Sequence, residues 1–169
     1  MHLIVDGYNL IRQSLQLQLL DAVDLQAGRE GLLELLGHYR RRSRHQVTVV
    51  FDGWQQGDCH EGRDRQHGIL IIYSRRGERA DEVIKRLLRQ ERERAVVVTS
   101  DRDIQLCAEQ VKAAWVPAAH FELSCLHGPA AAAAPEDDPD PSPRGSDKKG
   151  PARRLSKRQR QQRQRLKKL

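Results

Sequence analysis

The chain has 169 residues, a formal net charge of +7 and an apolar content of 38%. This length allows one domain of common size, and the low apolar content predicts that part of the chain lies outside any packed core. The sequence lacks the apolar segment of a signal peptide and the run of about 18 apolar residues that a membrane span requires, and its three cysteines show no C-x-x-C spacing. We therefore expect a protein of the reducing cytoplasm with no membrane partner.

Short β-branched runs alternate with longer segments of helical periodicity over the first 128 residues. The predicted strands are Leu3–Val5, Val47–Phe51, Ile69–Tyr73, Val96–Thr99 and a weaker Ala114–Val116. Apolar residues recur at helical spacing within residues 25–39, 83–88 and 104–111, and the polar stretch 52–68 is predicted to be a long mobile loop. This alternation predicts an α/β fold with a central parallel sheet flanked by helices on both faces.

Three of the predicted strands end in a carboxylate. Asp6 follows the apolar run in "LIVDG", Asp52 does so in "VVFDG", and Asp101 does so in "VVVTSDRD". A fourth acid, Asp81 in "GERADEV", begins the helix after the Ile69–Tyr73 strand. Because the carboxyl ends of parallel strands lie along one edge of a sheet, where ligands bind in open α/β folds, we expect these four carboxylates to converge there.

Such a group of acids indicates a metal site. Carboxylates a few ångströms apart repel one another and raise one another's pKa unless a cation lies among them. Hard oxygen ligands without organised Cys or His favour Mg²⁺ or Mn²⁺ over zinc. Ions of this kind activate water and stabilise the leaving oxygen in phosphoryl displacement, so the pattern favours phosphodiester hydrolysis. Individually, Asp6 also fits a simple turn and Asp81 an acid favoured by the helix dipole.

Neighbouring polar residues are supporting candidates, each with a structural alternative. Asn9 is suited either to orienting water or phosphate or to capping a helix. Asp52 either binds a metal through water or turns the chain. Ser100 and Arg102 flank Asp101, and the arginine either neutralises phosphate or is an exposed helical residue.

Two further acids are weaker candidates. Asp103 lies two residues beyond Asp101, which on a helix turns its side chain about 200° away, toward solvent. Glu82, beside Asp81, is ambiguous for a similar reason, because adjacent helical residues point in different directions.

The last segments of the chain differ from the rest in composition. All seven aromatic residues precede position 122, and residues 1–128 contain as many acids as bases. Six of the seven prolines lie between Pro129 and Pro151. We predict a folded domain at 1–126, a Pro/Ala-rich acidic linker at 127–152 and a basic tail at 153–169.

The tail has too few apolar residues to face a core, so we expect it to be disordered alone or helical when bound. Residues 144–169 hold twelve bases and one acid, and each Lys or Arg that pairs with a phosphate releases counterions. A nucleic acid is the favoured partner, and a merely solubilising tail is the alternative. The tail residues predicted to bind nucleic acid are Arg153, Arg154, Lys157, Arg158, Arg160, Arg163, Arg165, Lys167 and Lys168.

Four motifs in this order resemble those of the YacP-like NYN-domain nucleases, which belong to the PIN-like group of metal-dependent nucleases. They are "DGYN" (6–9), "VVFDG" (49–53), "GERADEVIKRL" (77–87) and "VTSDRDIQ" (98–105), and the resemblance covers residues 1–126.

The resemblance implies a PIN-like three-layer fold and endonucleolytic cleavage of RNA with Mg²⁺ or Mn²⁺. It implies that Asp6, Asp81 and Asp101 bind the metal, with Asn9 and Asp52 in supporting places. Some members act on messenger RNA at the ribosome. The family usually has Gly-Glu-Thr-Ala-Asp-Asp where this chain has Arg79 and Glu82 at the third and sixth positions, so local metal geometry or substrate entry is expected to differ.

These observations favour a cytoplasmic, divalent-metal-dependent endoribonuclease whose basic tail associates with RNA. A non-catalytic RNA- or ribosome-binding adaptor is the alternative, with the carboxylates structural. A phosphatase or other Asp-using α/β enzyme is a third reading. The sequence indicates no small-molecule cofactor.

Overall fold

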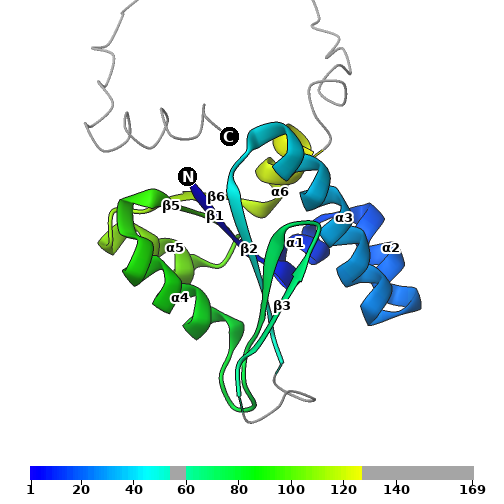
Figure 1. Ribbon diagram of the computed structural model, residues 1–169, viewed down its shortest axis with the longest axis horizontal. Helices are drawn as coiled ribbons and strands as arrows, with labels where there is room; N and C mark the ends of the chain where they lie inside the picture. The colour runs from blue at the N-terminus through cyan, green and yellow to red at the C-terminus, as the bar shows by residue number, and fades with distance from the viewer. Residues whose placement is uncertain (54–59, 127–169) are drawn as a thin grey trace, which may run out of the picture.

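The fold is a six-stranded sheet between two layers of helices (Figure 1). The computed structural model describes residues 1–53 and 60–126, so the predicted linker, the basic tail and Cys59 lie outside the described residues. In chain order the strands are β1 (His2–Asp6), β2 (Gln46–Phe51), β3 (Gly62–Gln66), β4 (Ile69–Tyr73), β5 (Ala95–Val98) and β6 (Ala114–Val116).

The sheet order is β3-β4-β2-β1-β5-β6, and every neighbouring pair except β3 and β4 is parallel. The central strand β1 pairs with β2 and β5, so that Asp6 lies opposite Val50. The predicted α/β fold and its five parallel strands are confirmed, with bounds that differ by one residue at several ends.

The prediction of a continuous mobile loop over 52–68 is wrong for its last part. Residues 62–66 form β3, which pairs antiparallel with β4. His67 and Gly68 join the two strands with φ values of 51° and 75°, and two consecutive positive φ values give the type I′ hairpin turn that suits the strand twist. β3 was not expected because "GRDRQ" lacks alternating apolar residues, and four of its five residues are exposed.

Among the described residues, seven helical segments of α or 3₁₀ type connect or follow the strands. They are α1 (Gly7–Gln13), α2 (Leu15–Val23), α3 (Leu25–Ser43), α4 (Ala80–Glu91), η1 (Arg92–Arg94), α5 (Arg102–Gln110) and α6 (Ala118–Phe121), and a π-helical turn, η2 (Glu122–Leu126), ends the described part of the chain. α4 and α5 cover one face of the sheet, and α1, α2, α3 and α6 lie on the other (Figure 1).

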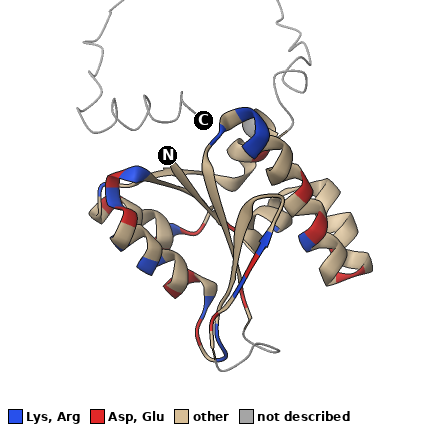
Figure 2. Cartoon of the chain, viewed as in Figure 1, with Lys and Arg blue, Asp and Glu red and all other residues tan. Residues whose placement is uncertain are grey.

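Two apolar cores form because successive strand residues point to opposite faces. In β1, Leu3 and Val5 pack toward α1 and α3, whereas Ile4 packs toward α4 and α5. All three are buried on this central strand, which explains its continuously apolar sequence. Charges of both signs are interspersed along the helices around these cores (Figure 2).

Two further expectations concern membrane-spanning segments and the cysteines. Within the described part of the chain, no helix combines the length and apolar character needed to cross a membrane. Cys107, on α5, is buried and free of disulfide bonding.

Candidate active site

Asp6 ends β1 and at the same time begins α1. Its backbone is extended, and its Oδ1 accepts a hydrogen bond from the Asn9 backbone N–H at 3.2 Å, which makes it the N-cap of the helix. Gly7 follows because a Cβ at this position would lie 2.6 Å from Cδ1 of Phe51. The abrupt change from strand to helix therefore fixes a carboxylate at the carboxyl edge of the sheet.

The Asp6 carboxylate lies in an environment that disfavours its charged form. Its residue is 8% exposed, and its pKa is raised from an ordinary 3.8 to about 6, mainly because burial disfavours the charged form. The charges of Asp81 and Asp101 contribute to this rise, whereas hydrogen bonds from Asn9 and Thr99 act in the opposite direction. Asp6 therefore shares one electrostatic environment with the two other acids predicted to bind metal.

Asp101 follows β5 and begins α5, as Asp6 begins α1. Its Oδ1 accepts hydrogen bonds from the backbone N–H groups of Asp103 at 2.7 Å and Ile104 at 3.2 Å. Thr99 links the two caps, because its Oγ1 donates to Asp6 Oδ2 at 3.2 Å and accepts from the Asp101 backbone N–H at 3.0 Å. One buried hydroxyl thus holds the Asp6 side chain and the backbone at which Asp101 begins α5.

Asp81 lies in the first turn of α4 and is partly buried. Burial raises its pKa, and the charge of Asp101 raises it further, while Lys85 and Arg79 lower it. Asp52, which follows β2, also raises the Asp81 pKa, and its Oδ1 accepts a hydrogen bond from Ser74 Oγ at 3.1 Å. All four predicted carboxylates therefore lie at the carboxyl ends of parallel strands or at the helix start that returns there.

The donor chemistry of this edge suits a hard cation, because Asp6, Asp81 and Asp101 offer oxygen and their mutual repulsion would be relieved by positive charge. Over residues 1–53 and 60–126, however, no three His, Cys, Asp or Glu side chains are grouped as a ready metal site. The structure brings the three acids into electrostatic contact and does not assemble them as a closed ligand set.

The remaining predicted residues divide into two groups. Asn9 lies inside the site, where its side-chain Oδ1 accepts a hydrogen bond from the Ser100 backbone N–H at 2.9 Å and ties α1 to the loop after β5. Ser100 Oγ in turn accepts from the Ala118 backbone N–H at 3.3 Å. Exposed side chains form the second group, which is Glu82, Arg102 and Asp103.

Two hydroxyl residues at this edge were missed from the sequence. Thr99 bridges Asp6 and Asp101, and Ser74 bridges the Asp52 carboxylate and the Gly53 backbone N–H, which donates to its Oγ at 2.9 Å. Both are buried polar residues directly after a strand. That pattern, a hydroxyl at the end of an otherwise apolar run, was the available signal.

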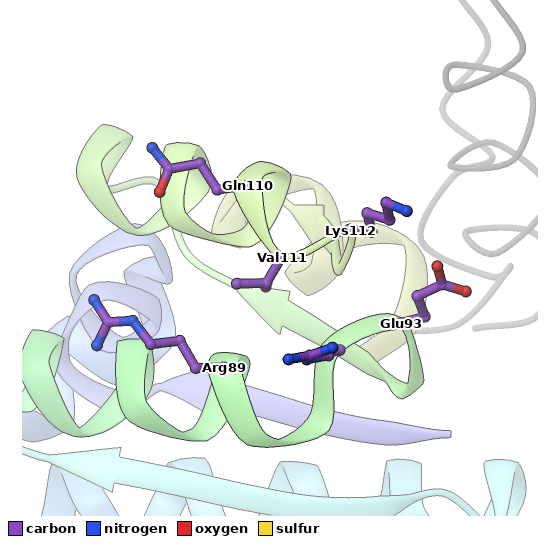
Figure 3. A pocket seen from close by; sticks show the side chains of 6 residues that line it. Arg89, Glu93, Gln110, Val111 and Lys112 are labelled. Atoms are coloured by element: carbon purple, nitrogen blue, oxygen red, sulfur yellow. The ribbon is translucent and has the colours of Figure 1, made fainter.

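A separate hollow of about 440 Å³ lies at the opposite edge of the sheet, where α4 and α5 end and β5 begins (Figure 3). Three basic residues, one acid, one amide and one valine line it, namely Arg89, Arg92, Lys112, Glu93, Gln110 and Val111. The four carboxylates lie at the other edge, so this hollow belongs to a different region from the candidate active site.

Comparisons with known proteins agree with the fold and the motifs. The YacP-like NYN domain model matches residues 3–168, which extends beyond residue 126 into the basic tail. The uncharacterized protein YacP of Bacillus subtilis is 33% identical over 85 residues, which is 50% of this chain and 49% of that protein. The chain thus matches about half the length of this curated relative.

Two crystal structures of Rae1 (YacP) from Bacillus subtilis are also similar to this chain. One of them, a tryptophan-to-leucine mutant of that protein, has a TM-score of 0.59 at 28% identity, and the match covers 69% of each chain. The second has a TM-score of 0.53 at 27% identity, and the match covers 70% of this chain and 69% of the other. Because the family model spans nearly the whole sequence, the chain belongs to the YacP-like NYN domain family.

Proposed function

We propose that this protein is a divalent-metal-dependent endoribonuclease that hydrolyses RNA phosphodiester bonds with Mg²⁺ or Mn²⁺. NYN domains belong to the PIN-like nuclease superfamily, whose members typically use divalent metals, and this membership supports an RNA nuclease. The observation that carries the proposal is the buried Asp6 carboxylate, whose pKa is raised by burial and further by Asp81 and Asp101. Perturbed acids of this kind concentrate at functional sites.

In this proposal Asp6, Asp81 and Asp101 hold the metal, which when bound supplies an activated water and stabilises charge on the leaving oxygen. Thr99 fixes the relative positions of Asp6 and Asp101 through its two hydrogen bonds. Asn9 fixes the loop that carries Ser100, and Ser74 holds the Asp52 carboxylate. Arg102 is exposed beside Asp101, where it is able to reach a substrate phosphate.

A cleavage assay on single-stranded and structured RNA tests the proposal. We expect cleavage with Mg²⁺ or Mn²⁺, none with EDTA, and a loss of at least about 10²-fold in kcat for Asp101→Asn. Asp24→Asn is the matched control, because Asp24 is exposed and its side chain makes no cap hydrogen bond at the start of α3. Equal cleavage by Asp101→Asn and wild type would indicate contamination. RNA binding without cleavage would support the non-catalytic adaptor, and turnover of small phosphomonoesters alone would support a phosphatase.

We further propose that the basic tail associates with RNA, including messenger RNA or the ribosome. Residues 144–169 contain twelve of the thirty bases, while residues 1–128 are formally neutral. Deleting residues 144–169 is expected to weaken RNA binding at low salt and to flatten its salt dependence, because fewer counterions are released. Metal-dependent cleavage at saturating RNA should persist. Unchanged affinity and an unchanged salt slope would refute the role of the tail.

A further inference from the structure

Three aromatic rings and one arginine form a cluster next to the candidate active site. The cluster consists of Tyr8, Phe51, Tyr73 and Arg29, which come from α1, β2, β4 and α3. The guanidinium carbon of Arg29 lies 5.4 Å, 5.6 Å and 5.5 Å from the ring centroids of Tyr8, Phe51 and Tyr73, respectively. Phe51 is buried, and the other three residues are partly exposed.

Strand alternation places this cluster across the sheet edge from the carboxylates. In β2, Phe51 packs with the core on the α3 side, so the next residue, Asp52, is turned toward the α4 side. In β1, Val5 packs on the α3 side, and Asp6 follows on the α4 side. An RNA strand bound across this edge of the sheet would have the acids on one side and Arg29 on the other.

The charge of Arg29 is not neutralised by an acid within the described residues. No carboxylate there lies within 4.0 Å of its guanidinium, and its polar partner is the Tyr8 hydroxyl, which accepts from Nε at 2.8 Å and also from Nη2. The Tyr8 hydroxyl proton is therefore directed elsewhere. A partly buried cation that rests on aromatic rings keeps N–H groups available for an anion.

We propose that Arg29 and Tyr8 bind an RNA phosphate that flanks the scissile one, and that they thereby position the strand across the carboxylates. This inference rests on the proposed nuclease function. Asp6 and Tyr8 are two residues apart, so their Cα atoms are at most about 7 Å from each other. The guanidinium and the phenol hydroxyl supply two kinds of donor to phosphate oxygens, and the rings beneath hold the guanidinium in place.

The test uses a short single-stranded oligoribonucleotide and a set of copies in which one phosphate at a time is replaced by a neutral methylphosphonate. For the wild type, neutralising the flanking phosphate should raise KM about tenfold and leave kcat within about twofold. Arg29→Gln should raise KM by the same factor with the unmodified RNA. Its KM should not rise further with the copy in which the flanking phosphate is neutral. Arg29→Lys should recover part of the affinity, because it restores the charge and not the planar donor pair.

Arg89→Gln is the matched control, because it removes one positive charge at the opposite edge of the sheet. It should respond to every modified copy as the wild type does. If Arg29→Gln and Arg89→Gln weaken binding equally, or if Arg29→Gln remains sensitive to every linkage, the proposed phosphate site is wrong. If Arg29→Gln does not fold, Tyr8→Phe retains the ring and should lose about threefold in affinity, only for RNAs that keep the flanking phosphate.

Binding of the same oligonucleotides in EDTA separates this inference from the nuclease proposal. If the wild type cleaves no RNA with Mg²⁺ or Mn²⁺, the nuclease proposal fails, and the linkage-specific loss of binding still decides whether Arg29 holds a phosphate. If cleavage occurs and no single linkage interacts with Arg29, the nuclease proposal stands and the phosphate site is refuted.

Discussion

At the carboxyl edge of the sheet the structure places four carboxylates, whereas the hollow at the amino edge is lined by three basic side chains. Helix dipoles favour part of this arrangement, since acids stabilise the starts of α4 and α5 and Arg89 stabilises the end of α4. The dipole of α4 therefore accounts for one of the three exposed bases at the amino edge. It does not account for Asp6, which is buried and has a raised pKa. The contrast supports the proposed metal-binding role of Asp6, because burial disfavours the charged form of its carboxylate.

The largest expected difference between the edges is in activity. Asp81→Asn removes the negative charge of one proposed metal ligand and is expected to lower kcat for RNA cleavage by roughly 10²–10³-fold. Lys112→Gln at the amino edge should change kcat by less than about twofold, because it lies far from the carboxylates. Single-turnover cleavage of one oligoribonucleotide by both variants gives the comparison. A similar loss in both would remove the functional distinction between the edges.

The second difference is in the pH dependence of stability. Because the pKa of Asp6 is raised from 3.8 to about 6, the neutral form stabilises the fold fully below pH 3.8, and this contribution is lost as the pH rises through about 6. This shift in the Asp6 pKa corresponds to a loss of about 3 kcal/mol of unfolding free energy at pH 8, relative to low pH. In EDTA, Asp6→Asn should therefore be more stable than the wild type at pH 8 and lose this advantage near pH 4.

Urea unfolding of both proteins across this pH range measures the effect. Asp24→Asn, which changes an exposed acid at the start of α3, should show no comparable pH-dependent gain. A difference between Asp6→Asn and the wild type that stays constant with pH would contradict the assigned cause.

The third difference is in the response to metal. If Mg²⁺ or Mn²⁺ binds the folded protein, ligand at about a hundred times its Kd should add about 2.7 kcal/mol to the unfolding free energy. Thermal unfolding should show an increase in Tm that is strongly reduced in Asp101→Asn and Asp81→Asn. Lys112→Gln should respond as the wild type does. The same increase in all four proteins would show that the ion acts elsewhere.

The smallest expected effect is a gain in stability at the amino edge. Lys112 follows α5 with φ 63°, and the Lys112 and Ala113 N–H groups donate to the carbonyls of Glu109 at 3.2 Å and Ala108 at 2.9 Å. This is the Schellman arrangement, in which glycine is favoured at the residue with positive φ. Lys112→Gly should raise the unfolding free energy by roughly 0.5–1 kcal/mol without affecting cleavage, as urea unfolding would show.

The sequence was sufficient to predict the parallel strands and the edge at which the four acids lie, because buried strands are continuously apolar and parallel strands end together. It was insufficient for β3, which is exposed and charged, and is held by its ladder with β4 and by the ion pairs of Glu61 with Arg63, at 2.9 Å, and Arg86. α2 also escaped prediction, because it exposes Leu15, Leu19 and Val23, so its apolar pattern does not mark one buried face.

Parts of the site could not be predicted because they depend on contacts between distant segments. Thr99 bonds Asp6 across 93 positions of sequence, and Asn9 bonds Ser100 across 91. The sequence around Arg29 does not indicate its environment, because the aromatic rings that it contacts come from three other elements. Motif spacing indicates which residues end strands, and only the packed structure shows which polar groups meet there.

Gly7, between Asp6 and Tyr8, couples any substitution at this position to the aromatic cluster around Arg29. Any side chain at Gly7 would collide with the Phe51 ring, which stacks on Tyr73 at a centroid distance of 5.8 Å and meets Tyr8 edge-on at 5.4 Å. A methyl group at Gly7 would therefore displace the Phe51 ring, and this displacement would pass through the neighbouring rings to the guanidinium of Arg29, some twenty positions away along the polypeptide. Gly7 acts as a spacer that sets the fit of a distant cation, although it has no polar side-chain atom of its own.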